Sequence, residues 1–159
     1  MYLTFLTLHN ISRWLVVIFG LIAIVRAFRG WFSKRDWQAQ DDKFGKFYVM
    51  FFDVQVLLGL ILYFGLSAIT VPAFRNFGAA MGVTATRYFL VEHLAIMLIA
   101  LAVAHIGRAR ASKAAQAVQK HKTSAIFFTT SFVLLLAGIP WPFLQGVGRP
   151  LLRLFGLDF

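Results

Sequence analysis

Four long apolar stretches constrain the fold of this chain more than any other feature. They cover about residues 4–27, 47–66, 88–106 and 123–139, and polar connections separate them. A helix of about 20 apolar residues crosses the roughly 30 Å hydrocarbon core of a bilayer. The sequence therefore predicts an all-α fold, an integral membrane four-helix bundle that forms a single transmembrane domain over residues 1–159.

The composition agrees with a protein that lies in lipid. Hydrophobic residues make up 60% of the chain and charged residues only 14%. A soluble domain of this size could not bury so much apolar surface, whereas a bilayer accepts it. The chain has no cysteine, which excludes disulfides, thiol catalysis, protein-bound iron–sulfur clusters and covalently attached c-type haem.

The basic residues predict how the chain is oriented. The net charge is +10, and most Lys and Arg residues lie in the connections after the first and third apolar stretches. The positive-inside rule places these connections in the cytoplasm, so that both termini face the outside of a bacterial inner membrane. Anionic head groups account for the charge, and no soluble surface remains for nucleic acid. The start of the chain lacks the basic region of a signal peptide and is interpreted as the first membrane helix.

Two further segments are expected to lie at the membrane surface. The connection over residues 67–87 is too weakly hydrophobic to span the bilayer, and we expect a short interfacial helix within Pro72–Met81. The last segment, residues 140–159, follows the fourth stretch at Pro140 and contains an amphipathic LLRLFGL run. This tail is predicted to be an interfacial segment packed on the rim of the bundle.

Two histidines are predicted to lie at the same depth in the membrane. His9 and His93 each lie about five residues below the outer end of their stretch, or roughly 7 Å at a rise of 1.5 Å per residue. Two imidazoles on different helices at one depth are the arrangement needed to ligate the iron of a b-type haem from both sides. The sequence therefore marks His9 and His93 as candidate haem ligands.

Residues close to these histidines would complete such a site. Arg13 lies one turn below the first histidine and could pair with a haem propionate or with Glu92. Ala100 and Ala104 fall within about 20° of the direction of His93 on an ideal helix, so they would leave room for a flat macrocycle.

The same residues fit two other interpretations. His9 and Arg13 could anchor the first helix in the head groups, while Glu92 and His93 could form a polar cluster that joins helices. The two histidines could instead contact a quinone. The residues alone leave these alternatives open.

A second group of polar residues lies nearer the cytoplasmic side. Asp53 and His105 are at similar depth, so Asp53 could accept a hydrogen bond from His105 or pair with Arg108. We expect a structural polar lock here, with a quinone head-group site or a proton path as the alternative. Gln55 and Gly59 share a face of the second stretch, where another helix could approach closely. A second haem is not expected, because the two histidines of the third stretch lie about 120° apart around the helix.

Other catalytic patterns are missing from the sequence. It has no glycine-rich phosphate loop, no pair of histidines at metal-binding spacing and no set of residues typical of a serine hydrolase. His121, flanked by two lysines, is predicted to be solvated.

The chain resembles a group of small four-helix bacterial membrane proteins that are described as cytochrome-b-like. Short motifs spread over nearly the whole chain carry this resemblance: His9-Asn-Ile-Ser-Arg13-Trp14, Gln55-x-x-x-Gly59-x-x-Leu62-Tyr63, Glu92-His93, Ala104-His105-Ile-Gly-Arg108, Lys120-His121-Lys122 and Ile139-Pro-Trp-Pro-Phe143. The resemblance implies an accessory subunit of a larger quinol-oxidising or photosynthetic electron-transfer assembly. It also implies that an inner haem site is lacking, because Asp53 stands where the second helix of this group often carries histidine.

The sequence thus predicts a membrane electron-transfer subunit rather than a stand-alone enzyme. It would hold haem b between the first and third helices and exchange electrons with a quinone or a partner subunit. The alternative is a haem-free structural or accessory subunit of a larger respiratory or photosynthetic complex. The expected partners are the lipid bilayer and other membrane subunits of such a complex.

Overall fold

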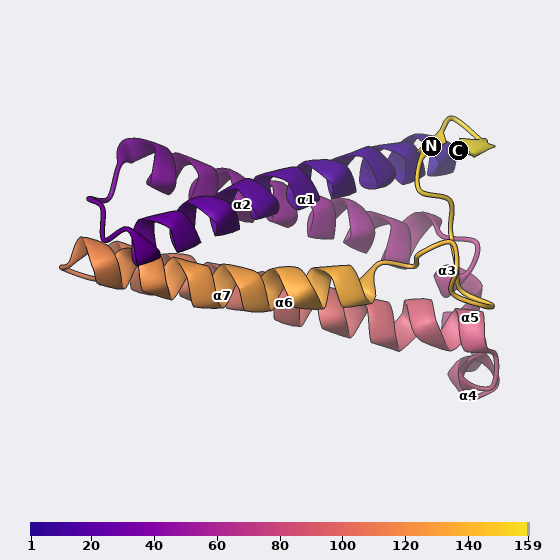
Figure 1. The fold of residues 1–159 in the computed structure, drawn as a ribbon. Helices are drawn as coiled ribbons and strands as arrows, with labels where there is room; N and C mark the ends of the chain where they lie inside the picture. The colour runs from indigo at the N-terminus through magenta and orange to yellow at the C-terminus, as the bar shows by residue number, and fades with distance from the viewer. Residues whose placement is uncertain (159) are drawn as a thin grey trace.

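Four long helices lie side by side along the length of the molecule in the computed structural model, which describes residues 1–158 (Figure 1). Helix α1 covers Tyr2–Phe32, α2 covers Ala39–Ile61, α6 covers His93–Lys113 and α7 covers Ala117–Gly138. The N-terminus and the last residues lie at one end of the molecule, which we call the terminal end. The short α1–α2 and α6–α7 connections lie at the other end. Most Lys and Arg residues surround these connections, so we call this the basic end.

Three helices are long and apolar enough to cross a membrane. One is α1, and the other two are the continuous helices that contain α2 and α6. Segment η1 extends α2, whereas α5 and η3 precede α6. Helix α7 is not among the three, and its first turns carry the polar run around His121. The bounds of the added segments are Leu62–Leu66 for η1, Thr84–Arg87 for α5 and Tyr88–Glu92 for η3.

The four long helices do not pack equally against one another. Helix α1 packs closely against α2 and α7, and α6 packs closely against α7. Helices α2 and α6 meet over far fewer residues, and we call this line the α2–α6 seam. Glycines permit the close approaches, since Phe127 of α7 lies against Gly107 of α6 and the ring of Tyr48 lies against Gly20 of α1.

A polar contact lies within the apolar core. Val16, Tyr48 and Phe52 are fully buried at the centre of the bundle. The hydroxyl of Ser131 donates to the carbonyl of Ala100 over 2.7 Å, so Tyr48 donates in turn to Ser131, also over 2.7 Å. These two bonds join α2, α7 and α6 across the middle of the molecule.

The outward faces of the long helices are apolar. Leu21 on α1, Leu57 on α2, Ile99 on α6 and Val133 on α7 are each more than half exposed. A water-soluble monomer rarely exposes so many large apolar side chains, whereas hydrocarbon tails solvate them well. This surface is consistent with a membrane protein.

Helices α1 and α2 extend further than the apolar stretches predict, which shortens the connection between them. Lys34 adopts a left-handed backbone conformation (φ 52°) just beyond the end of α1. Asp41 accepts a hydrogen bond from the backbone N–H of Gln38 over 3.0 Å and so fixes the start of α2. Helix α7 ends as predicted, because Ile139 is extended before Pro140.

The connection between α2 and α6 contains short helical segments rather than one interfacial helix over Pro72–Met81. Asn76 interrupts the helix, and its side chain accepts a hydrogen bond from the N–H of Ala79 over 3.1 Å to begin α4. The bounds are Thr70–Ala73 for α3, Phe74–Asn76 for η2 and Phe77–Met81 for α4.

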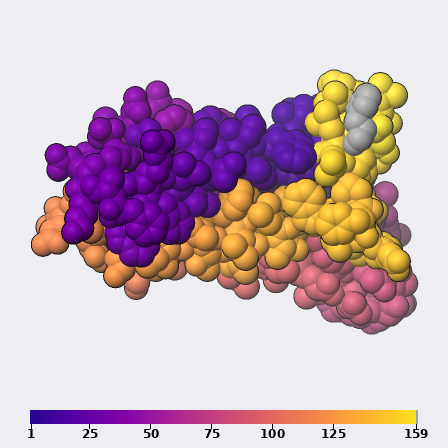
Figure 2. Space-filling view, in the orientation of Figure 1, coloured from indigo at the N-terminus to yellow at the C-terminus, as the bar shows by residue number. Residues whose placement is uncertain are grey.

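The tail packs on the rim of the bundle, as predicted, but as an extended strap rather than a helix. Figure 2 shows it spread over the terminal end. The N–H of Arg153 donates to the side chain of Asn10 over 3.1 Å, and the N–H of Phe155 donates to the hydroxyl of Thr7 over 3.0 Å. The strap ends in an antiparallel pair of short strands, β1 (Arg153–Leu154) and β2 (Leu157–Asp158).

The prediction that His121 is solvated is wrong. Its side chain is fully buried at the basic end, packed against Gly30 of α1 and 4.8 Å from the ring of Trp37 between centroids. Neither ring nitrogen has a hydrogen-bond partner among the described residues. The short α1–α2 connection causes this burial, because it brings Trp37 against the first turns of α7.

Candidate functional site

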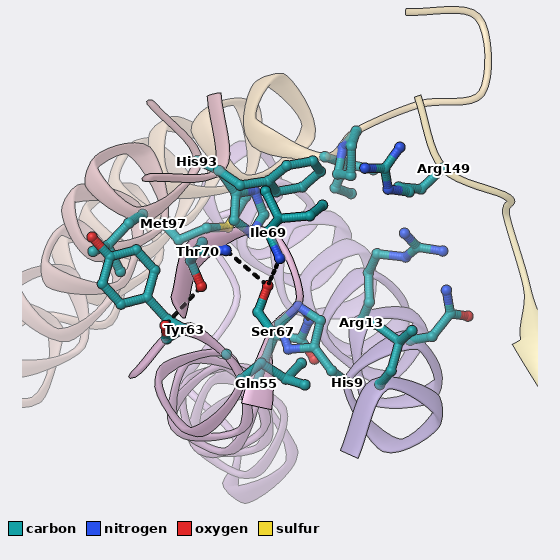
Figure 3. A pocket seen from close by; sticks show the side chains of 18 of the residues that line it. His9, Arg13, Gln55, Tyr63, Ser67, Ile69, Thr70, His93, Met97 and Arg149 are labelled. Atoms are coloured by element: carbon teal, nitrogen blue, oxygen red, sulfur yellow. Dashed lines mark hydrogen bonds between the residues drawn. The ribbon is translucent and has the colours of Figure 1, made fainter. Parts of the chain in front are cut away.

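A cavity of about 180 Å³ opens at the terminal end of the bundle (Figure 3). Helices α1, α2, α6 and α7 and the strap all contribute to its walls. Apolar side chains such as Val56, Met97 and Leu135 line its deeper part, and His9 and His93 also line it. The cavity therefore contains the two histidines that the sequence marks as candidate ligands.

His93 is held by the end of α7. Its Nδ1 donates a hydrogen bond to the carbonyl of Gly138 over 2.7 Å, and the hydroxyl of Tyr88 donates to the same carbonyl over 2.9 Å. This carbonyl belongs to the last turn of α7 and has no partner within that helix. Because the proton of the neutral ring is fixed on Nδ1, the lone pair of His93 lies on Nε2.

His9 is held by α2. The hydroxyl of Ser12 donates to the side-chain oxygen of Gln55, so the amide nitrogen of Gln55 faces His9 Nε2 at 3.2 Å. The Nδ1 atom of His9 is buried without a hydrogen-bond partner. Gly59 permits the contact, since a Cβ there would lie 3.1 Å from the ring. The predicted close approach at Gln55 and Gly59 is therefore confirmed, and His9 is the residue that approaches.

The two imidazole rings face each other across the cavity. Their centroids are 6.5 Å apart, and the ring planes meet at 68°. Figure 3 shows them on opposite walls. The two rings therefore come close together, as the predicted pair requires. Ala100 and Ala104 do not line the cavity as expected, because α7 packs over that face of α6 and buries both residues completely.

Three arginines line the same cavity, and no aspartate or glutamate lines it. Arg13 donates to the carbonyl of Leu151 in the strap, and its Nε has no hydrogen-bond partner. Arg149 lies with its guanidinium carbon 4.9 Å from the ring centroid of Phe89. Arg153 is the third of these arginines, and its guanidinium is already paired with the carboxylate of Asp158. The cavity is therefore suited to a ligand that is largely apolar and carries negative charge.

Glu92 does not take part in this site. Its carboxylate accepts a hydrogen bond from Arg87 over 2.8 Å on the surface, and it does not line the cavity. The suggested pair between Arg13 and Glu92 is not formed, because η3 turns Glu92 outward while Arg13 binds the strap.

The second polar group lies at the α2–α6 seam, apart from the cavity. His105 Nε2 lies 2.8 Å from a carboxylate oxygen of Asp53, which confirms the predicted contact. About half of each side chain is exposed, 52% for His105 and 48% for Asp53. Arg108 pairs with Asp42 over 3.2 Å rather than with Asp53. These two pairs connect α2 and α6 where their apolar contacts are fewest.

Sequence reasoning missed the cavity residues that come from irregular segments. Arg149, Arg153 and Thr70, which all line the cavity, were assigned no role in a site. The hydroxyl of Thr70 donates to the carbonyl of Tyr63 over 2.7 Å and so ties α3 to the end of η1. The only signal in the sequence was the charge of the tail, which does not reveal how the tail folds.

Within residues 1–158, no three His, Asp or Glu side chains gather in a way that would hold a metal ion on their own. Comparisons of this chain with protein families, with curated proteins and with solved structures find no match.

Proposed function

We propose that this protein is a membrane electron-transfer subunit that holds a b-type haem between His9 and His93. The observation that carries this proposal is the facing pair of imidazoles, 6.5 Å apart between centroids, on two different helices. Two metal–nitrogen bonds of about 2 Å each, together with the two ring radii, require centroids roughly 6 Å apart. The observed spacing matches this requirement.

The hydrogen bonds of the two rings also fit. His93 donates from Nδ1 to a backbone carbonyl, which is the usual support of a metal-ligating imidazole and leaves Nε2 for the metal. His9 Nε2 faces the amide of Gln55, so ligation would replace this single hydrogen bond. Both rings thus have a nitrogen that could bind a metal.

The cavity is small for a macrocycle, so it would have to widen to hold one. Sites for small molecules usually measure about 300–1,000 Å³, and this cavity measures about 180 Å³. Helices α2 and α6 are in loose contact, so the α2–α6 seam is the direction in which the site can widen. Arg13 and Arg149, which form no ion pair within residues 1–158, would neutralise the propionates. A bound haem would supply one-electron chemistry.

The proposed setting is a four-helix bundle in the bacterial inner membrane. Helix α7 packs against both α1 and α6, so it would cross the bilayer as the fourth span although its own sequence is less apolar. The positive-inside rule places the basic end in the cytoplasm and the cavity near the outer surface. The proposed partners are a quinone and other membrane subunits of an electron-transfer complex.

An absorption spectrum of the purified protein tests the haem proposal. We expect a Soret band that shifts on reduction, because two imidazoles make a six-coordinate iron. His93→Ala and His9→Ala should each remove or strongly alter the band. His105→Ala is the matched control, because it also removes a membrane histidine but lies outside the cavity, and it should keep the band.

A colourless protein, or a band that survives both cavity substitutions, would rule out this haem site. The first result would favour the haem-free accessory subunit. The unpartnered Nδ1 of His9 gives a second candidate, a quinone head group in the same cavity. Binding of a short-chain quinone by the colourless protein, lost in His9→Ala, would support that function.

A further inference from the structure

A second cavity, of about 210 Å³, lies at the basic end. Its walls come from the α1–α2 connection, the start of α2, the end of α6 and residues 120–128 of α7. Arg108, Lys120, Ser124 and Trp37 line it. We call it the basic-end cavity. It shares no lining residue with the histidine cavity, so any ligand there is independent of the proposed haem.

The two carboxylates of the basic-end cavity already have partners. Asp41 Oδ1 accepts from Arg26 over 2.9 Å and from Arg35 over 2.6 Å, and Oδ2 accepts from the N–H of Gln38 over 3.0 Å. Asp42 lies 3.2 Å from Arg108. Arg108 and Lys120 line the cavity and equal the two carboxylates in number. Arg26 and Arg35 bind Asp41 from outside the lining, so basic side chains outnumber acidic ones only when these two are included.

Two polar groups of the cavity have no partner. Lys120 forms no ion pair within residues 1–158. Ser124 is 2% exposed, and its hydroxyl has no hydrogen-bond partner. Both belong to the first two turns of α7, whose first residue is Ala117 and whose N-terminus has no side-chain cap. The positive end of the helix dipole adds to the charge of Lys120.

We propose that the basic-end cavity binds a phosphate group. A compact anion with several acceptor oxygens matches an unpaired ammonium, a guanidinium that is shared with only one carboxylate, and a hydroxyl that lacks a partner. The source is either the head group of an anionic phospholipid or free phosphate. Trp37 beside the cavity is the type of residue that lies at the level of lipid head groups.

Thermal unfolding of the purified protein in detergent tests this proposal. The midpoint is measured with increasing short-chain phosphatidylglycerol, with phosphatidylcholine, and with inorganic phosphate. A ligand that binds only the folded protein raises the midpoint. If phosphatidylglycerol raises the midpoint and inorganic phosphate does not, the cavity is a lipid site. If inorganic phosphate also raises the midpoint, the cavity binds the phosphate group itself. No stabilisation by phosphatidylglycerol or by phosphate overturns the proposal.

Two substitutions separate a site from general surface attraction. Lys120→Gln removes the unpaired ammonium of the cavity, and we expect the half-saturating ligand concentration to rise about five-fold. Lys113→Gln removes the same charge from the end of α6 outside the cavity, and it should change that concentration less than two-fold. An equal rise of the half-saturating concentration in the two variants would overturn the proposed site. Ser124→Ala should weaken binding without changing the net charge.

Discussion

At the scale of single residues, His121 makes the basic end sensitive to pH. Burial lowers the pKa of His121, although the nearby charge of Asp41 opposes this effect. The folded protein therefore holds the neutral ring, whereas the unfolded chain takes up a proton near pH 6.5. Folding stability from this residue is present above that pH and is lost as the pH falls through the lowered pKa.

We therefore expect the thermal midpoint to fall between pH 8 and pH 5, and to fall less in His121→Gln. The glutamine is polar but does not titrate, so it removes the proton uptake of the unfolded chain at this position. Thermal scans across this range measure both proteins. Parallel curves for the wild type and the variant would contradict the assignment of this pH dependence to His121.

The histidines also show what could be predicted from residues alone. The closeness of His9 and His93 was predicted, although the helix that carries His93 begins at Thr84 rather than at the predicted start of the third stretch. The burial of His121 was not predicted. Its two flanking lysines suggest that the side chain is exposed to solvent, whereas the fold covers the ring with Trp37. Local sequence describes the neighbours in the chain, and burial depends on neighbours in space.

At the scale of helices, the hydroxyl of Ser131 holds three of them together. Its removal in Ser131→Ala leaves the buried hydroxyl of Tyr48 without its acceptor and takes from the Ala100 carbonyl the hydrogen bond that it accepts in addition to the one within α6. An unsatisfied buried polar group costs about 1–3 kcal/mol. We expect the thermal midpoint to fall by roughly 2–4 °C for each kcal/mol.

Thr130→Val is the control for this substitution. Thr130 lies beside Ser131 on α7, but its hydroxyl bonds only within the helix, to Ile126, on an exposed face. Its loss should change stability by less than about 0.5 kcal/mol. The double variant Ser131→Ala with Tyr48→Phe should recover part of the loss, because the unpaired phenol is then also absent. A purely additive pair would contradict the proposed bond.

The positions of the helices were easier to predict than their ends. Four apolar stretches correspond to the four long helices, because hydrophobic length is a strong and local signal. The irregular segments were harder. Residues 67–87 fold as several short helical turns, since Asn76 offers a local cap that divides the expected helix. The seam contact between Asp53 and His105 was predicted, but its exposure was not.

At the scale of the whole molecule, the strap completes the terminal end. Arg13 and Trp14 of α1 both donate to the carbonyl of Leu151, the latter over 3.0 Å. Deleting residues 149–159 removes this acceptor and leaves a buried guanidinium poorly satisfied. We expect a loss of about 1–3 kcal/mol, measured as a lower thermal midpoint.

Leu151→Ala is the control for the deletion. It trims a side chain that is 43% exposed but keeps the backbone carbonyl, so stability should change little. A truncated protein as stable as the intact one would show that the strap does not support α1. The position of the strap on the rim was predicted, but its contacts could not be, because they join segments far apart in the chain and depend on backbone atoms that every residue carries.

The contact between Arg13 and Leu151 also has a consequence for biosynthesis. The two residues are 138 positions apart, so α1 leaves the ribosome long before its carbonyl partner exists. During that interval the nascent helix holds an arginine whose charge is costly in hydrocarbon. The terminal end of the molecule can mature only once translation has passed residue 151, which makes assembly there a late event in folding.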